Sequence, residues 1–278
     1  MSYRRHFKFL FNFATIVSVQ ISAVLISFNE ENNIAAAIDS VGWADEILLI
    51  DSGSTDRTRE IAESVGAKVI VRPWPGFSAQ KQFGADSAIH DWIFSLDADE
   101  RVSPQLAGSI AQIKNVPALA DGFKVSRLAF YMGRPIRHGG WYPDRQLRLF
   151  DRRKGKWSGA VVHESVKMSH DSIIRTLAGD IHHFTVDSVL AHHKMIGERY
   201  APLGADLMIA SVRRTSPLVA AFSGLAAFVR SYFFKLGLLD GFPGFCIAWF
   251  GAHNAFLKHS IVLEAQRAAI SSEKSLHS

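Results

Sequence analysis

Three apolar runs that end in polar clusters decide the fold: ISAVLISFNEE (residues 21–31), EILLIDSGSTD (46–56) and WIFSLDADE (92–100). Short runs rich in Ile, Leu and Val predict β-strands, and Ala, Ile and Val at three- and four-residue spacing predict helices. The predicted strands cover residues 21–27, 46–50, 68–71 and 92–96, and the predicted helices cover residues 31–41, 56–65 and 77–89. Ser54 or Thr55 is expected to cap the second helix. Alternating strands and helices predict an α/β fold, with a mostly parallel sheet and helices on both faces.

The carboxyl ends of parallel strands meet at one edge of a sheet, where ligands bind. Three predicted strands end there in acidic clusters, which include Asp51 and the sequence Asp97-Ala98-Asp99-Glu100. Two carboxylates one residue apart repel each other unless a cation compensates them. Mg²⁺ and Mn²⁺ prefer oxygen ligands and complete their shell with water and substrate phosphates. The sequence therefore predicts a site for a divalent cation and a diphosphate.

Composition and motifs exclude several classes of protein. The 278 residues are 48% apolar and 21% charged, which excludes a disordered or low-complexity chain. The single cysteine, Cys246, lies in an apolar run and excludes a disulfide framework and a multi-cysteine zinc site. Neither G-x-x-x-x-G-K-[ST] nor G-x-G-x-x-G follows a predicted strand, which argues against a P-loop NTPase and a nicotinamide dehydrogenase. Nothing in the sequence resembles a nucleic-acid-binding module.

The three motifs, in this order and at these separations, resemble the inverting family-2 glycosyltransferases with the GT-A fold. The resemblance continues through GGWYPDRQLRLFDRRKGKWSGAVVHES (residues 139–165), HHFTVDS (182–188), RYA (199–201) and KLGLLDGFPGF (235–245), and is closest to the lipopolysaccharide-core heptose β-glucosyltransferase subgroup. It implies a GT-A (Rossmann-like) domain with a C-terminal helical extension. The expected divisions are a basic and aromatic arm (1–19), the GT-A domain (20–200) and a helical region (201–278).

The resemblance also implies roles for the residues at the predicted site. Phe28 and Glu30 would line the nucleotide pocket, Asp51 would hold the base or ribose, and Lys81 would contact the donor. Many relatives have two acids where this chain has Asp51-Ser52. The contact that the second acid makes with the base is therefore in doubt here.

The acidic motif and a later histidine are the expected cation site. By the resemblance, Asp99 would be the main metal ligand, Asp97 would face the ribose or the metal, and Ala98 between them would line the donor site. His183 would complete the metal shell or touch the diphosphate, and a structural hydrogen-bonding role is its alternative.

Inversion requires a carboxylate that takes the proton of the acceptor hydroxyl. Glu164 occupies the position of the acceptor-side acid in the subgroup, and Asp144 is the reserve candidate. The alternative for Asp144 is a turn residue paired with Arg145 or Arg148. Trp141 and Tyr142 offer stacking surfaces for an acceptor sugar, or belong to the core.

Several stretches predict contact with a membrane without crossing it. Residues 218–229 carry no charge but number only twelve, whereas a bilayer requires about 20. Residues 236–257 are apolar but are interrupted by charged, glycine and proline residues, so they fit core or interfacial helices. Residues 124–156 carry ten basic and two acidic residues, which form either a solvated face or a wall facing phosphates.

Together with these stretches, the resemblance implies a peripheral enzyme on the cytoplasmic face of a bacterial inner membrane. It would use a divalent cation to move a hexose, glucose from UDP-glucose, to a lipid-anchored saccharide such as lipopolysaccharide inner-core heptose. Two alternatives stay open: transfer to a polyprenyl phosphate, and a non-catalytic protein that binds nucleotide sugars.

Overall fold

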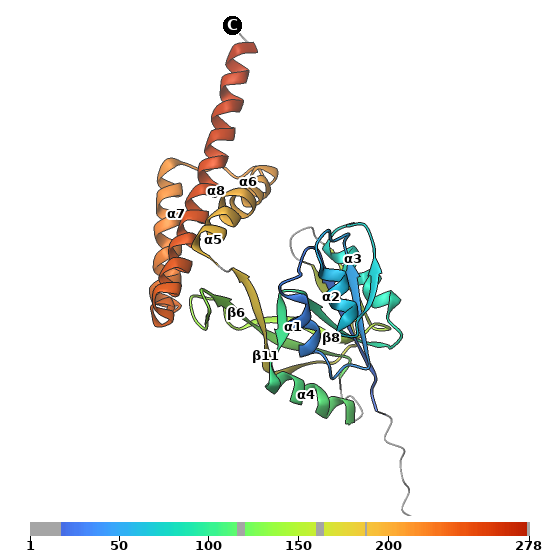
Figure 1. Cartoon of the computed structure of the whole chain (residues 1–278). Helices are drawn as coiled ribbons and strands as arrows, with labels where there is room; N and C mark the ends of the chain where they lie inside the picture. The colour runs from blue at the N-terminus through green and yellow to red at the C-terminus, as the bar shows by residue number, and fades with distance from the viewer. Residues whose placement is uncertain (1–17, 116–119, 160–163, 187, 277–278) are drawn as a thin grey trace, which may run out of the picture.

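The structure, a computed structural model, describes residues 18–115, 120–159, 164–186 and 188–276. One mixed sheet, in the order β3-β2-β1-β4-β8-β6-β11-β5, forms the centre of the α/β part (Figure 1). The helices that follow β11 pack together beside this part, and the end of α8 extends beyond both. The expected arm lies almost wholly outside the described residues.

The first half of the sheet confirms the alternation expected from the sequence. Strands β1 to β4 pair in parallel, so their carboxyl ends share one edge. The elements are β1 (Ile21–Ser27), α1 (Ile34–Ser40), β2 (Glu46–Asp51), α2 (Thr58–Ser64), β3 (Lys68–Val71), α3 (Phe77–Ser87) and β4 (Trp92–Asp97). Each predicted strand is correct to within one residue at either end, because each apolar run is bounded by polar or turn residues.

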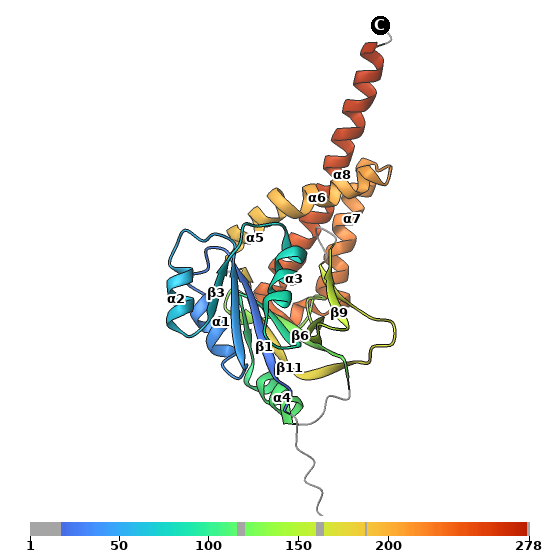
Figure 2. The same cartoon turned by 90° about the vertical axis from the view of Figure 1, so that its right-hand side faces the viewer.

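Helices cover both faces of this half-sheet. Ile34 and Ile38 of α1 and Ala62 of α2 pack on one face, in the same core cluster as Leu25 and Phe94. On the other face α3 packs so closely that a Cβ on Gly84 would lie 2.4 Å from Val24 Cγ1. Figure 2 shows α3 and the β9–β10 hairpin on this side.

The second half of the sheet is mixed. Strand β8 runs antiparallel to both β4 and β6, while β11 is parallel to β6 and antiparallel to β5. The elements are β5 (Glu100–Val102), α4 (Pro104–Asn115), β6 (Gly122–Tyr131), β7 (Arg134–Pro135), β8 (Asp144–Asp151), β9 (Gly155–Ser158), β10 (Ser165–Met168) and β11 (Ile174–Val186). Pairing of β5 with β11 places His183 opposite Glu100, next to the end of β4.

The helical part begins at Val189, before the boundary expected at residue 201. Its elements are α5 (Val189–Met195), η1 (Ile196–Tyr200), α6 (Ala201–Ala210), α7 (Pro217–Val229), η2 (Arg230–Phe234), η3 (Gly237–Asp240) and α8 (Gly241–Leu276). Among the described residues, Pro217–Phe234 is the one helical segment long and apolar enough to cross a bilayer, by length and composition alone. It is longer than the charge-free stretch because the helix continues through Arg230. Only 11% of it is buried.

The sequence KLGLLDGFPGF forms the joint between the two parts. The buried Asp240 carboxylate accepts hydrogen bonds from the backbone N–H groups of Arg137 and His138, at 3.3 and 2.8 Å, and lies 2.8 Å from His138 Nδ1. A Cβ on Gly244 would lie 1.9 Å from the Gly237 carbonyl oxygen, so only glycine fits there. This motif therefore fixes the start of α8 to the loop that precedes β8.

Candidate active site

A cavity of about 690 Å³ opens at the carboxyl ends of β1 and β4. Its walls come from the strand ends, the β3–α3 loop, β6, β11 and the first helices of the helical part. The residues on them are Ile26, Ser27, Phe28, Glu30, Ser52, Trp74, Phe77, Asp97, Ala98, Asp99, Arg127, Glu164, His183, Arg199, Tyr200 and Leu203. The cavity is within the size range of small-molecule sites and combines apolar walls with a few polar groups.

Asp51 does not lie on this cavity, which corrects its expected contact with the base or ribose. Its carboxylate is fully buried and accepts hydrogen bonds from the backbone of Gly53 and Ser54 and from the Ser27 and Ser54 hydroxyls. Four donors occupy its oxygens, so Asp51 shapes the turn after β2. The neighbouring Ser52 faces the cavity instead.

The expected cap of α2 is also wrong, because Ser54 and Thr55 hold the β1–α1 loop. Ser54 Oγ accepts from the Asn29 backbone N–H at 2.9 Å, and the Thr55 backbone N–H donates to Asn29 Oδ1 at 2.9 Å. The helix starts at Thr58, whose N–H donates to Asp56. The two loops thus position Phe28 and Glu30 on the cavity wall.

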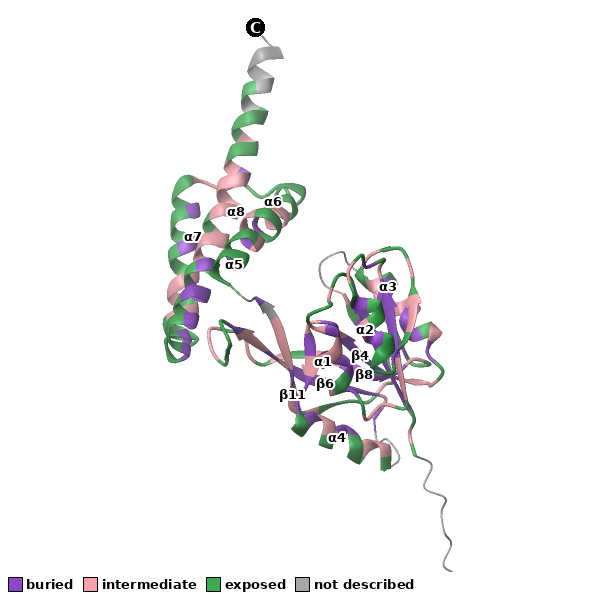
Figure 3. Cartoon of the chain, in the orientation of Figure 1, coloured by how far each residue is buried: buried purple, intermediate pink, exposed green. Residues whose placement is uncertain are grey.

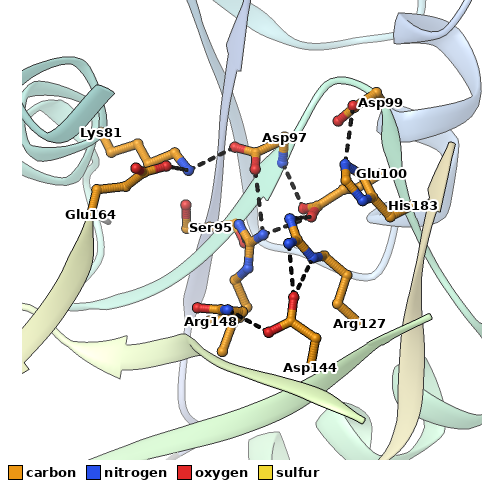
Figure 4. Close-up of polar contacts among 11 residues, drawn as sticks. Lys81, Ser95, Asp97, Asp99, Glu100, Arg127, Asp144, Arg148, Glu164 and His183 are labelled. Carbon is orange, nitrogen blue, oxygen red and sulfur yellow. Dashed lines mark hydrogen bonds and ion pairs between the residues drawn. The ribbon is translucent and has the colours of Figure 1, made fainter. Parts of the chain in front are cut away.

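Lys81 lies beneath the cavity between two carboxylates (Figure 4). Its Nζ is 2.9 Å from Asp97 Oδ1 and 3.3 Å from Glu164 Oε1, and its side chain is 4% exposed. Lys81 lines a smaller adjoining cavity that shares Asp97, Arg127 and Glu164 with the main one, so its expected contact with the donor stays a prediction. Its ammonium group joins the end of β4 to the segment before β10.

A buried ion network continues from Asp97 and was not predicted from the sequence, in which Arg148 was only a possible partner of Asp144 and no contact was expected between Arg148 and Glu100. Arg148 reaches Asp97 at 3.4 Å and Glu100 at 2.6 Å. Burial opposes ionisation of Asp97, but the charges of Lys81 and Arg148 hold its pKa well below the usual range. Burial raises the pKa of Glu100, and Arg148 offsets that rise only in part. Asp97 is therefore a charged group whose position is fixed by Lys81 and Arg148.

Asp144 is held by Arg127 rather than by Arg145 or Arg148. Arg127 donates to Asp144 Oδ2 at 2.7 and 2.9 Å and lies 3.6 Å from Glu100. Asp144 starts β8, so it is a strand residue and not a turn residue. It lines a second cavity of about 400 Å³ that shares Arg127, His183 and Tyr200 with the first.

Asp99 and His183 meet on the wall of the main cavity. Asp99 Oδ2 lies 3.2 Å from His183 Nε2, and the backbone N–H of Phe184 donates to the Asp99 carbonyl at 3.0 Å. Among the described residues no three His, Cys, Asp or Glu side chains cluster tightly enough to hold a metal alone. A carboxylate and an imidazole facing a cavity fit a cation whose remaining ligands are phosphate and water oxygens.

The structure thus brings seven of the predicted residues to one cavity. These are Phe28, Glu30, Asp97, Ala98, Asp99, Glu164 and His183. Of the two aromatic candidates, Trp141 lines the second cavity, whereas Tyr142 donates to Asp180 at 2.9 Å. His163, which precedes Glu164 in the motif, lies outside the described residues.

Comparison with known proteins identifies the family of this chain. Residues 22–174 match the profile of Glycosyl transferase family 2. The chain belongs to this family. It is 30% identical to the lipopolysaccharide core biosynthesis glycosyltransferase LpsC of Rhizobium meliloti, over 87% of this chain and 91% of LpsC. An uncharacterized glycosyltransferase of Rickettsia bellii is 30% identical over 87% of this chain and 86% of its own. Glucosyl-3-phosphoglycerate synthase from Mycobacterium tuberculosis overlaps 41% of this chain and 45% of its own, with 28% identity and a TM-score of 0.33.

The chain is therefore a glycosyltransferase with a GT-A fold. The region matched by the family profile contains most of the residues that line the cavity. Every predicted site residue except His183 falls within the matched region. Arg199, Tyr200 and Leu203 also line the cavity from beyond it. The RYA motif, which contains Arg199 and Tyr200, is part of the resemblance, but no role was predicted for it or for Leu203.

Part of the basic surplus of residues 124–156 is neutralised by ion pairs in this glycosyltransferase. Arg127 and Arg148 pair with the buried network, and Arg153 and Lys154 pair with Asp151 and Asp121 at 2.6 and 2.9 Å. Of these four residues, only Arg127 reaches the cavity. Most of the other basic residues of the stretch are exposed, which favours the solvated face over a wall facing phosphates: Lys124, Arg134, Arg137, Arg145 and Lys156.

Proposed function

We propose that this glycosyltransferase uses a divalent cation to move glucose from UDP-glucose, with inversion, to a lipid-anchored saccharide such as lipopolysaccharide inner-core heptose. The observation that carries the proposal is one cavity that holds both the Asp99–His183 pair and Glu164. The Asp99–His183 pair suits a cation bound to a diphosphate leaving group, and Glu164 suits an acceptor hydroxyl. The name of LpsC supports the choice of acceptor.

The donor half of the cavity is formed by the loops after β1 and β4. Asp99 and His183 would hold Mg²⁺ or Mn²⁺, which would offset the negative charge of the departing diphosphate. Asp97 stays ionised through Lys81 and Arg148, so its carboxylate is a hydrogen-bond acceptor for donor hydroxyl groups. Phe28 is 57% exposed at the cavity, where a nucleoside would cover it.

The acceptor half contains Glu164, the proposed base. Its carboxylate is 23% exposed and is steadied by Lys81 at 3.3 Å, so it is both positioned and accessible. It would take the proton of the acceptor hydroxyl as the sugar transfers. Asp144 is the reserve, but two bonds from Arg127 already engage it.

The helical part supports a membrane-bound acceptor. Large apolar side chains are exposed along α7 and around the turn to α8, including Leu218 (70%), Phe222 (64%) and Phe234 (79%). Arg213, Arg214, Arg230 and Lys235 are exposed beside them. Apolar groups with adjacent cations are typical of surfaces that bind anionic lipid heads. We place the enzyme peripherally on the cytoplasmic face of the inner membrane.

A transfer assay on native lipid-linked saccharide tests the proposal. Lipid-linked saccharide from a deletion strain, mixed with purified enzyme, UDP-glucose and Mn²⁺, should gain one hexose by mass, and EDTA should abolish the gain. Hexose found on polyprenyl phosphate instead would support that alternative acceptor. Binding of UDP-glucose without transfer or hydrolysis, with and without Mn²⁺, would support a non-catalytic role.

A further inference from the structure

The segment η1 presents one face to the donor cavity from outside the family-matched region. Arg199, Tyr200 and Leu203 all line the cavity, and their spacing places them on the same side of the helix. Packing anchors this segment, since Ile196 is 4% exposed in the cluster formed with Phe250 of α8. A π-helical turn of this kind is often found at functional sites.

Arg199 is the cavity cation that the rest of the site leaves available. Of the residues that the structure describes, four acids line the cavity, namely Glu30, Asp97, Asp99 and Glu164, and the only other arginine on it is Arg127. Arg127 is held by Asp144 and Glu100. In the described part of the chain, no carboxylate lies within 4.0 Å of the Arg199 guanidinium, which lies 5.9 Å from the Tyr200 ring.

A diphosphate adds negative charge to a cavity whose wall already carries more acids than bases. One divalent cation at Asp99 and His183 balances only part of that charge. A guanidinium group binds phosphate oxygens through two parallel hydrogen bonds, which makes arginine well suited to this task.

We infer that Arg199 binds the diphosphate of the nucleotide-sugar donor and stabilises the nucleoside diphosphate as it leaves. The inference rests on the proposed donor class, and it assigns a diphosphate-binding residue to the helical part. Tyr200, 44% exposed beside it, completes that wall. The helices that carry the membrane-facing surface thus also carry a residue of the donor site.

Binding of nucleoside diphosphates and monophosphates, measured by calorimetry with Mg²⁺, tests the inference. The full-length protein is titrated with UDP, UMP and the corresponding guanosine, adenosine, cytidine and thymidine nucleotides. Arg199→Gln should weaken binding of the preferred diphosphate by about 10- to 100-fold and change binding of its monophosphate less than about twofold. Arg199→Lys should restore part of the loss, and Arg175→Gln, an exposed arginine of β11 away from the cavity, should change neither.

The possible results separate this inference from the function on which it rests. If the unmodified protein binds no nucleoside diphosphate, the proposed donor class is wrong and the inference is wrong with it. If Arg199→Gln binds the diphosphate normally, or loses diphosphate and monophosphate equally, only the inference is wrong. A change in acceptor KM alone would also overturn it, because Arg199 would then contact the acceptor.

Discussion

The α/β part and the helical part of this glycosyltransferase differ in how far they bury their apolar side chains. All seven residues of β1 are buried, and Phe94 and Leu49 of neighbouring strands are fully inaccessible. In the helical part, Phe222 and Phe234 are 64% and 79% exposed, and Figure 3 shows α7 mostly in the colour of exposed residues.

This difference indicates that the two parts of the chain have different roles. The α/β part buries its own core and supplies most of the residues on the cavity, to which the helical part adds Arg199, Tyr200 and Leu203. The helical part also leaves an apolar surface exposed to water, and such surfaces are typical of contact with a membrane or another protein. If the division is correct, changes at the cavity should affect chemistry, and changes on the exposed face of the helical part should affect location.

The largest expected effect is the loss of Asp99. Asp99→Asn should lower turnover by several orders of magnitude and abolish metal-dependent donor binding, because the cation that offsets the diphosphate charge would lose a ligand. Turnover is measured as nucleotide release, and binding by calorimetry with and without Mn²⁺. Asp206→Asn, an exposed acid of α6, is the matched control from the helical part and should leave both unchanged. EDTA-sensitive turnover in Asp99→Asn would remove Asp99 from the cation site.

Replacing the proposed base should have the next largest effect. Glu164→Gln keeps the size of the side chain but cannot accept the proton, so kcat should fall by about 10²- to 10⁴-fold while donor affinity stays near normal. The measurement is kcat for transfer beside the Kd of the donor. Asp144→Asn is the comparison variant. Normal turnover in Glu164→Gln and loss in Asp144→Asn would exchange the two roles.

The packing of α5 against β6 and α8 should respond to acid. His192 is 6% exposed against Tyr131, Trp141 and Phe250, and burial lowers its pKa to about 4. The unfolded chain, with a histidine pKa of about 6.5, therefore binds the proton more readily. Stability from this group is complete above about pH 6.5 and is lost as the pH falls toward 4, by about 3 kcal/mol in total.

Urea unfolding between pH 7.5 and 4.5 measures this loss. His192→Phe should flatten that part of the pH dependence, whereas the exposed neighbour His193→Gln should retain it. The same slope in His192→Phe and in the unmodified protein would mean that other groups control the acid response.

The sequence predicted the part of the site that depends on local signals. Each acidic cluster follows a recognisable strand, and parallel pairing places Asp97 and Phe28 at the same edge. The prediction for Asp51 failed because its carboxylate accepts four hydrogen bonds from Ser27 and from the turn after β2. These contacts depend on the conformation of the turn, which the residue type alone does not reveal.

The missed contacts join residues far apart in the chain. Lys81 meets Glu164 across 83 positions, and Arg148 meets Glu100 across 48. Both pairs depend on the second half of the sheet, which turns antiparallel after β4 and has few strand signals in its sequence. A buried arginine such as Arg148 also cannot be distinguished from a surface arginine until the fold shows its partners.

The smallest expected effect concerns single cations of the helical part, and it decides what that surface contacts. Lys235→Gln and Arg230→Gln, made separately, should each weaken binding to vesicles of phosphatidylcholine and phosphatidylglycerol by about 1 kcal/mol, or about fivefold. The loss should shrink in high salt, because surface charges are screened. Lys68→Gln, an exposed lysine of β3, should bind vesicles like the unmodified protein. Equal binding by all three variants would show that vesicle contact does not use these charges, and concentration-dependent self-association would then point to a second protein copy over the exposed face of α7.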